Sequence, residues 1–242
     1  MSRIAQAYIH FSISPDNLAS WGEEAEQLSY EIASSIFPEN VEIIIELELG
    51  SLRSRITVIG VLGILFTAYQ GIASYSDFKN SISEMVEDAQ EFSSLFNEQF
   101  IENVAAPQSS VLNRQRRTET PGRVNRALLR LEAVERDIST LSNNEVREEL
   151  EKIAKLLRTA LDDMDDEERN RAVKIIADRH LPHLPGRNPL ISALRPKEHR
   201  EFEKLYYPVL ISAAPNNDYV SIIRTGRPLK SQKQKPKPRI TD

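Results

Sequence analysis

Residues 56–75, ITVIGVLGILFTAYQGIASY, form a run of twenty residues without a single charge. As a helix this run would be about 30 Å long, which matches the hydrocarbon thickness of a bilayer. Arginines precede it at positions 53 and 55, and Asp77 and Lys79 follow it, as expected of groups at the two membrane surfaces. The sequence therefore predicts a buried helix, placed either in a membrane or in a tight contact between helices.

Small side chains recur every three or four positions in this run and would form one stripe along a helix. Such a stripe lets a second backbone approach closely, either in a bilayer or in a soluble bundle. Its partner would be another copy of the chain or a different helical protein. The predicted helix-packing stripe consists of Gly60, Gly63, Thr67, Gly71 and Ser74.

The start of the apolar run has two interpretations. In one, residues 52–58 return as the second arm of a hairpin after the break at Gly50 and Ser51. In the other, Ser51 caps a helix that runs through the apolar run to Val104. We expect the helix, because an apolar stripe at helical spacing continues through residues 78–100.

The N-terminal part predicts a β-α-β unit. Residues 4–13 alternate between apolar and polar side chains, which indicates a strand with one buried face. Residues 18–36 carry apolar side chains at helical spacing after Pro15, and residues 41–49 alternate again with acids on the outer face. Together with the long helix, these elements make up a predicted acidic unit over residues 1–104.

The remainder of the chain is predicted to be mostly helical. Residues 105–122 are polar and lack periodicity, so they are expected to be a linker. Residues 123–225 read as a helical region followed by a late hairpin, with strands at 206–212 and 219–225. Residues 226–242 are expected to be a disordered basic tail. The predicted fold class is thus α+β and mostly helical.

The two halves of the chain carry opposite charge. Residues 1–112 hold 4 Lys and Arg against 16 Asp and Glu, whereas residues 113–242 hold 27 against 20. The basic half could bind nucleic acid or anionic lipid headgroups, or its charges could only solubilise it. No aromatic residues alternate with the basic ones, although stacking on single strands needs them. The candidate anion-binding residues are Arg114, Arg116, Arg117, Arg123, Lys233, Lys235 and Lys237.

No motif for catalysis, metal binding or nucleotide binding was recognised. The chain lacks cysteine, which removes thiolate chemistry. His180 and His183 are three residues apart, but Pro182 lies between them and no further ligand completes a metal site. The acidic run 162–168 lacks the spacing of a calcium loop. We therefore expect a protein that is not an enzyme and needs no cofactor.

Residues 41–92 resemble a recurring pattern in uncharacterised bacterial proteins. In it, an acidic strand ending in Gly-Ser-Leu leads into a hydrophobic helix and a Tyr-x-Asp-Phe step, here Tyr75, Asp77 and Phe78. The resemblance implies a bacterial origin and carries no functional residue with it. The leading hypothesis is a scaffold or accessory subunit at the bacterial inner membrane, held there by residues 56–75. The alternative is a soluble, cytoplasmic, oligomeric adaptor whose basic half binds nucleic acid.

Overall fold

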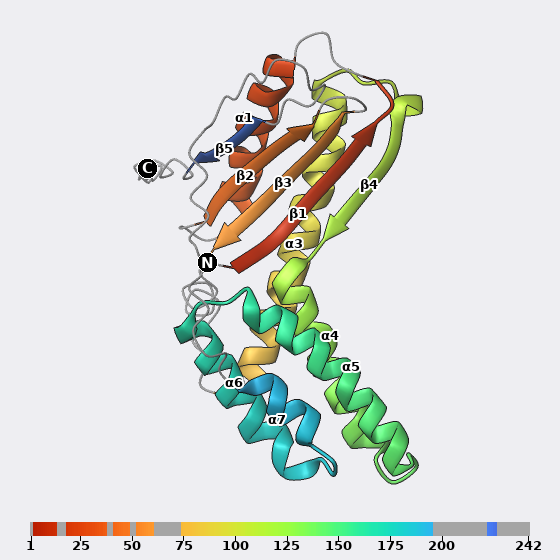
Figure 1. Ribbon diagram of the computed structural model, residues 1–242. Helices are drawn as coiled ribbons and strands as arrows, with labels where there is room; N and C mark the ends of the chain where they lie inside the picture. The colour runs from red at the N-terminus through yellow and green to blue at the C-terminus, as the bar shows by residue number, and fades with distance from the viewer. Residues whose placement is uncertain are drawn as a thin grey trace, which may run out of the picture.

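The computed structural model describes residues 2–13, 18–37, 41–48, 52–60 and 74–195, together with the backbone of residues 222–226. Figure 1 shows an antiparallel sheet backed by helices, with a second group of helices below it. The strands are β1 (Ser2–Phe11), β2 (Val41–Glu48), β3 (Arg53–Gly60), β4 (Val111–Arg117) and β5 (Ile222–Gly226). The helices are α1 (Leu18–Ile36), α3 (Tyr75–Asn103), α4 (Glu119–Asp137), α5 (Asn143–Asp162), α6 (Asp166–His180) and α7 (Asn188–Leu194), with short 3₁₀ turns η1 (Gln108–Ser110) and η2 (Leu181–His183).

The protein has the predicted α+β fold with a predominance of helix and an N-terminal β-α-β unit. The strand order in the sheet is β4-β1-β3-β2-β5, and all neighbouring strands are antiparallel. β5 shows that the second predicted strand of the late hairpin joins this sheet beside β2. The first one, residues 206–212, lies outside the described residues, as does the predicted basic tail from residue 227 on.

β3 overturns the expectation of a helix over residues 52–58. Ile56 and Val58 are buried in the core, while Arg55 points to the other face and reaches Glu46 of β2 at 2.8 Å. Two features favour the strand. The run is rich in β-branched residues, and its arginines stand opposite the acids of β2, which stabilises antiparallel pairing. The hairpin interpretation of this stretch is therefore confirmed.

The predicted membrane-spanning helix over residues 56–75 is wrong as well. Residues 56–60 belong to β3, and α3 begins only at Tyr75, the last residue of the apolar run. Among the helices in the described ranges, none is long and apolar enough to cross a bilayer. The uncharged run therefore does not form one helix from end to end, because its first part is extended backbone in the middle of a sheet.

α3 is the longest described helix and carries much of the core. Ser74 begins it with a capping box, in which Ser74 Oγ accepts from the Asp77 amide at 3.2 Å and the Asp77 carboxylate accepts from the Ser74 amide at 3.0 Å. Its later turns pack on the sheet and its first turns on α4 and α6 (Figure 1). Three fully buried phenylalanines, Phe92, Phe96 and Phe100, stack along one face.

The predicted linker, residues 105–122, is wrong in its middle and at its end. Residues 111–117 form β4, which pairs with β1, and α4 already begins at Glu119. β4 lies at the edge of the sheet, where both of its faces can remain in contact with water, so it needs no apolar face. Its sequence VLNRQRR therefore carries none of the alternation by which a half-buried strand is recognised.

The helical region begins with α4 and α5, which lie side by side as an antiparallel pair (Figure 1). Ser142 and Glu145 form a capping box at the start of α5, and Asp165 and Glu168 form another at the start of α6. The acidic run 162–168 thus forms the junction between α5 and α6. It is only partly solvated, however, because Glu168 is 1% exposed and accepts from Ser2 Oγ of β1 at 3.2 Å.

Candidate nucleic-acid interface

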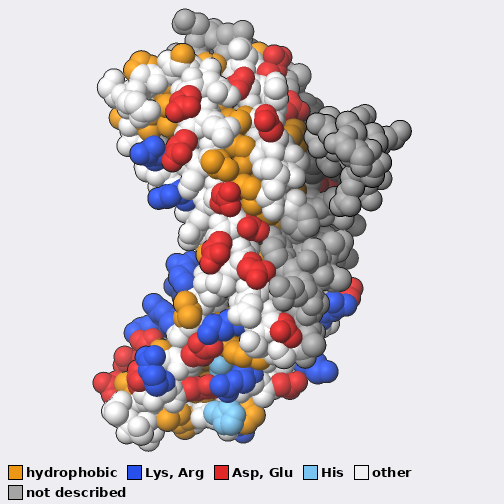
Figure 2. Space-filling model, turned by 180° about the vertical axis from the view of Figure 1, so that it is seen from behind, with side chains coloured by type: hydrophobic (Ala, Val, Ile, Leu, Met, Phe, Trp, Pro, Cys, Tyr) orange, Lys and Arg blue, Asp and Glu red, His pale blue; other side chains and the backbone are white. Residues whose placement is uncertain are grey.

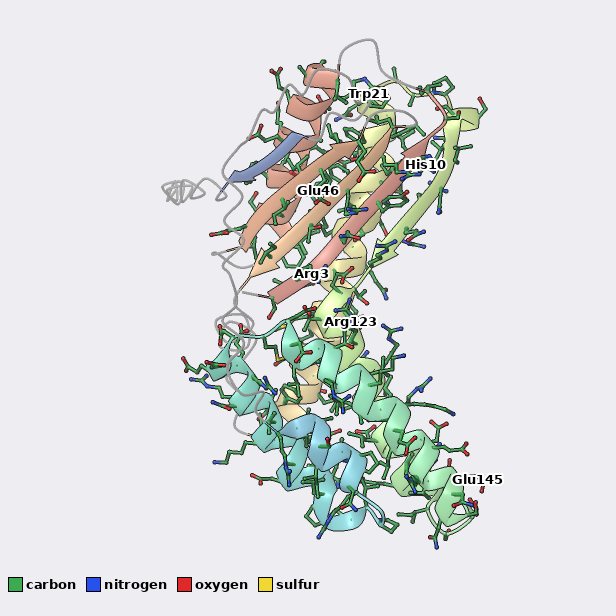
Figure 3. The ribbon with its side chains drawn as sticks, in the orientation of Figure 1. Arg3, His10, Trp21, Glu46, Arg123 and Glu145 are labelled. Carbon is green, nitrogen blue, oxygen red and sulfur yellow. The ribbon has the colours of Figure 1, made fainter. Side chains whose placement is uncertain are left out.

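One face of the sheet carries no helix within the described part of the chain. α1 and α3 both pack on the opposite face, which lies behind the strands in Figure 1. In Figure 3 the labelled His10 and Glu46 lie on the near side, on β1 and β2. Because successive side chains of a strand alternate between faces, every second residue of β1, β3 and β4 belongs to this open face.

The strand register identifies the residues of the open face. Ala7 and Ile9 of β1 are buried against the helices, so their neighbours point to the open side. Residues directly opposite one another in antiparallel strands share a face. The open face therefore carries Gln6, Tyr8 and His10 of β1, Arg53, Arg55 and Thr57 of β3, and Asn113, Gln115 and Arg117 of β4.

Arg117 lies across the open face with its guanidinium carbon 5.6 Å from the centre of the Tyr8 ring. It donates to Gln6 Oε1 at 2.8 Å from Nη1 and to Gln115 Oε1 at 2.9 Å from Nε. Gln6 in turn is buried and donates to Thr57 Oγ1 at 3.0 Å. These bonds hold the cation over the aromatic ring before any ligand arrives, in the geometry of a cation–π contact.

The charges on the two sides of this face differ. Arg55 is paired with Glu46, and Arg53 with Glu48 at 3.6 Å, so β2 neutralises the cations of β3. Partial burial acts to lower the pKa of Arg55, but the hydrogen bond to Glu46 and the neighbouring negative charges outweigh it and raise that pKa above its ordinary value. Arg55 is therefore permanently charged and already paired with a carboxylate, Glu46.

The three arginines of β4 are in a different situation. Within the described residues, no carboxylate lies at salt-bridge distance from Arg114, Arg116 or Arg117. All three are exposed, and Arg116 donates to Ser94 Oγ of α3 at 3.0 Å. Figure 2 shows the helix side of the sheet with many acidic side chains. An anion is therefore attracted to the β4 edge of the molecule and repelled from the acidic part of the helix side that lies away from this edge.

The structure brings together three of the seven predicted anion-binding residues. Arg114, Arg116 and Arg117 lie on β4, with Arg117 on the open face and the other two pointing to the helix side of the edge. Arg123 does not join them, because it is held by Asp163 at 2.7 Å and Glu119 at 2.9 Å. The remaining three, Lys233, Lys235 and Lys237, lie outside the described residues.

The predicted helix-packing stripe is not present as one helical face. Gly60 is the last residue of β3, and Ser74 is the N-cap of α3. Gly63, Thr67 and Gly71 lie outside the described residues. Since a helix cannot include Gly60 while that residue pairs in the sheet, the stripe as drawn from the sequence is wrong.

Tyr8 is the residue that sequence reasoning missed. It is separated from the β4 arginines by about a hundred residues, and only the pairing of β1 with β4 places its ring beside them. Comparison with protein-family models, curated proteins and solved structures gave no match. Function is therefore inferred from the chain's own geometry.

A second polar cluster lies in the helical region and has the outline of a catalytic triad. The fully buried His180 contacts Glu135 Oε1 at 2.8 Å through Nδ1 and the Tyr75 hydroxyl at 3.0 Å through Nε2. Burial, together with the nearby Glu132 carboxylate, strongly raises the pKa of Tyr75. The phenolate that a nucleophile would need is thus disfavoured, so this geometry does not support Tyr75 as a nucleophile. In the described residues, no group of three or more His, Asp or Glu is arranged to hold a metal ion.

Proposed function

We propose that this protein is an adaptor that binds single-stranded nucleic acid on the open face of its sheet along β1 and across the β4 edge, where Arg117 points to the open face and Arg114 and Arg116 point to the other side. The observation that carries the proposal is Arg117 held over the Tyr8 ring, next to two further arginines that have no carboxylate partner among the described residues. The ring and the guanidinium above it together form a platform on which a base can stack, and the guanidinium also neutralises phosphate.

A single strand fits this surface better than a duplex. Reading a duplex in its major groove requires a helix or a two-stranded ribbon that enters the groove. The half-buried Tyr8 ring lies on a sheet face without a described helix and can stack only with bases that are themselves unstacked. The acids of β2, of which Glu46 and Glu48 pair with β3, would repel phosphates and confine the strand to the β1 and β4 side.

The first test removes the three arginines of β4, which have no carboxylate partner among the described residues. We expect the triple variant Arg114→Ala, Arg116→Ala and Arg117→Ala to bind a labelled single-stranded oligonucleotide about 10- to 100-fold more weakly in fluorescence anisotropy at low salt. The dependence of log affinity on log salt should become shallower by about 2, since each lost phosphate contact on a single strand contributes about 0.7.

The matched control is the triple variant Arg147→Ala, Arg158→Ala and Arg171→Ala. It removes the same charge from exposed positions in the helical region. Equal weakening by both triples would mean that only net charge matters, and an undetectable affinity of the unaltered protein at about 50 mM salt would reject the function outright.

The Tyr8 ring has a separable role. Tyr8→Ala should weaken single-strand binding roughly 5- to 100-fold, because stacking of a base on an aromatic side chain contributes about 1–3 kcal/mol. Tyr8→Phe keeps the ring and should bind like the unaltered protein. Titrating both variants with a single strand and with the duplex of the same sequence measures this. Equal affinities for the two nucleic acids, or no effect of Tyr8→Ala, would contradict stacking.

A further inference from the structure

The polar cluster around His180 connects three helices. It contains Tyr75 and Lys79 of α3, Glu132 and Glu135 of α4, and His180 at the end of α6. Tyr75 also lies 3.1 Å from Glu132 through its hydroxyl, and Lys79 donates to both oxygens of Glu132 at 2.9 and 2.8 Å. The His180 ring is 0% exposed and stands edge-on to the Tyr75 ring at 5.0 Å between centroids.

The cluster holds fewer protons than its contacts need. Three contacts, Glu135 to Nδ1, Nε2 to the Tyr75 hydroxyl, and that hydroxyl to Glu132, each need one proton. A neutral imidazole and a phenol supply only two. Nδ1 faces a carboxylate and must carry the ring proton, so the single Tyr75 proton serves either Nε2 at 3.0 Å or Glu132 at 3.1 Å. One of these two contacts is then left without a proton.

A second proton on His180 would rearrange the cluster. Nε2 would donate to the Tyr75 oxygen, and the Tyr75 hydroxyl would turn to Glu132. Burial of the ring and the Arg179 charge oppose that state, whereas the charges of Glu135 and Glu132 favour it. Glu132 and Glu135 are already balanced by Lys79 and by Arg179, which lies 3.3 Å from Glu135. α7, which packs on α6, carries no titratable side chain to compensate a third cation.

Burial accordingly lowers the pKa of His180 below its ordinary value, and the Arg179 charge adds to this, whereas the hydrogen bond and charge of Glu135 act in the opposite direction. Protons can reach the cluster from solvent. Glu135 and Arg179 line an open hollow of about 530 Å³ together with Ile138 and His183.

We infer that His180 is an acid-sensitive latch, which holds α6 against α3 and α4 while it is neutral and loosens their contact when it takes up a proton. Unfolded chains bind that proton at about pH 6.5. A histidine that resists protonation in the fold therefore contributes its full stabilisation above this pH. The contribution is lost progressively as the pH falls below 6.5 toward the lower folded-state value.

The experiment follows thermal unfolding of the full chain by circular dichroism between about pH 5 and pH 7.5, above the range in which ordinary carboxylates titrate. We expect the Tm of the unaltered protein to fall by up to about 3–5 °C per pH unit below pH 6.5. His180→Gln, which cannot take up a proton there, should lose this decline whatever its absolute Tm. His183→Gln, an exposed neighbour, should keep it. An unchanged decline in His180→Gln would overturn the latch.

A second measurement covers the case in which His180→Gln does not fold. The ring protons of the unaltered protein can be followed by NMR, with His183→Gln to help assign the signals. The latch requires a His180 midpoint below about 6.5 and faster amide exchange in α6 on the acid side of it. A midpoint at or above that value, or α6 exchange that does not change with His180 protonation, would refute it.

Discussion

Replacing Phe96 with alanine is expected to lower the free energy of unfolding by about 3–5 kcal/mol, the usual cost of removing a buried aromatic ring. Phe96 is fully buried on α3 and stacks between Phe92 at 6.3 Å and Phe100 at 5.2 Å between ring centroids. The cavity would open where α3 packs on the sheet, and the two flanking rings would each lose their stacking contact with Phe96. Chemical denaturation followed by circular dichroism measures the change.

Gln90→Ala is the matched control, because Gln90 lies on the exposed side of the same helix. It should alter stability by no more than about 0.5 kcal/mol, as is usual at surface positions. A loss below 1 kcal/mol in Phe96→Ala would show that the phenylalanine stack is not the centre of the core.

Arg123→Ala should have the second largest effect, a loss of about 2–4 kcal/mol, because it breaks a largely buried ion pair and leaves carboxylates behind. The Glu119 side chain is only 7% exposed and would keep its charge without the cation. Asp163 would retain Thr120 at 3.2 Å and Arg3 at 3.5 Å, which limits the loss. Denaturant titration of the variant gives the value.

The same variant separates two roles of arginine in this chain. Arg130→Ala, on the exposed surface of α4, is the control and should be nearly neutral for stability. If Arg123 is structural, as its contacts indicate, Arg123→Ala should bind single-stranded nucleic acid as Arg130→Ala does under conditions where both are folded. A selective loss of binding in Arg123→Ala would show that Arg123 belongs to the nucleic-acid binding surface.

The sequence is most informative where an element buries one face. β1, α1, β2 and α3 carry the apolar spacing of a half-buried strand or helix and overlap with predicted elements, and α4 to α6 lie in the region predicted to be helical. β3 is harder to predict from the sequence, because its apolar residues continue directly into the apolar residues 61–73. Periodicity therefore does not show where a strand ends. The length of the uncharged run favoured a helix, whereas the pairing of Arg55 with Glu46 decides for the strand.

The candidate site could be predicted only in part, for a related reason. The β4 arginines stand out as a basic cluster in the sequence, but β4 itself has no buried face and looked like a linker. Arg117 meets Tyr8 only through the pairing of two strands that are distant in the chain. His180 likewise finds Tyr75 and Glu135 only after three helices have packed. Contacts of this kind depend on tertiary structure and leave no local pattern.

The position of β1 between β3 and β4 has a consequence during protein synthesis. β1 is made first, receives β3 as its neighbour by residue 60, and gains β4 only by residue 117. At about 5–20 residues per second, the intervening chain takes roughly 3–12 s to emerge. For that time the nascent chain exposes an unpaired β1 edge, to which another strand could add. Ribosome-bound chains that stop before β4 should therefore be the most prone to aggregate. Once β4 has paired with β1, the edge of the sheet carries three arginines.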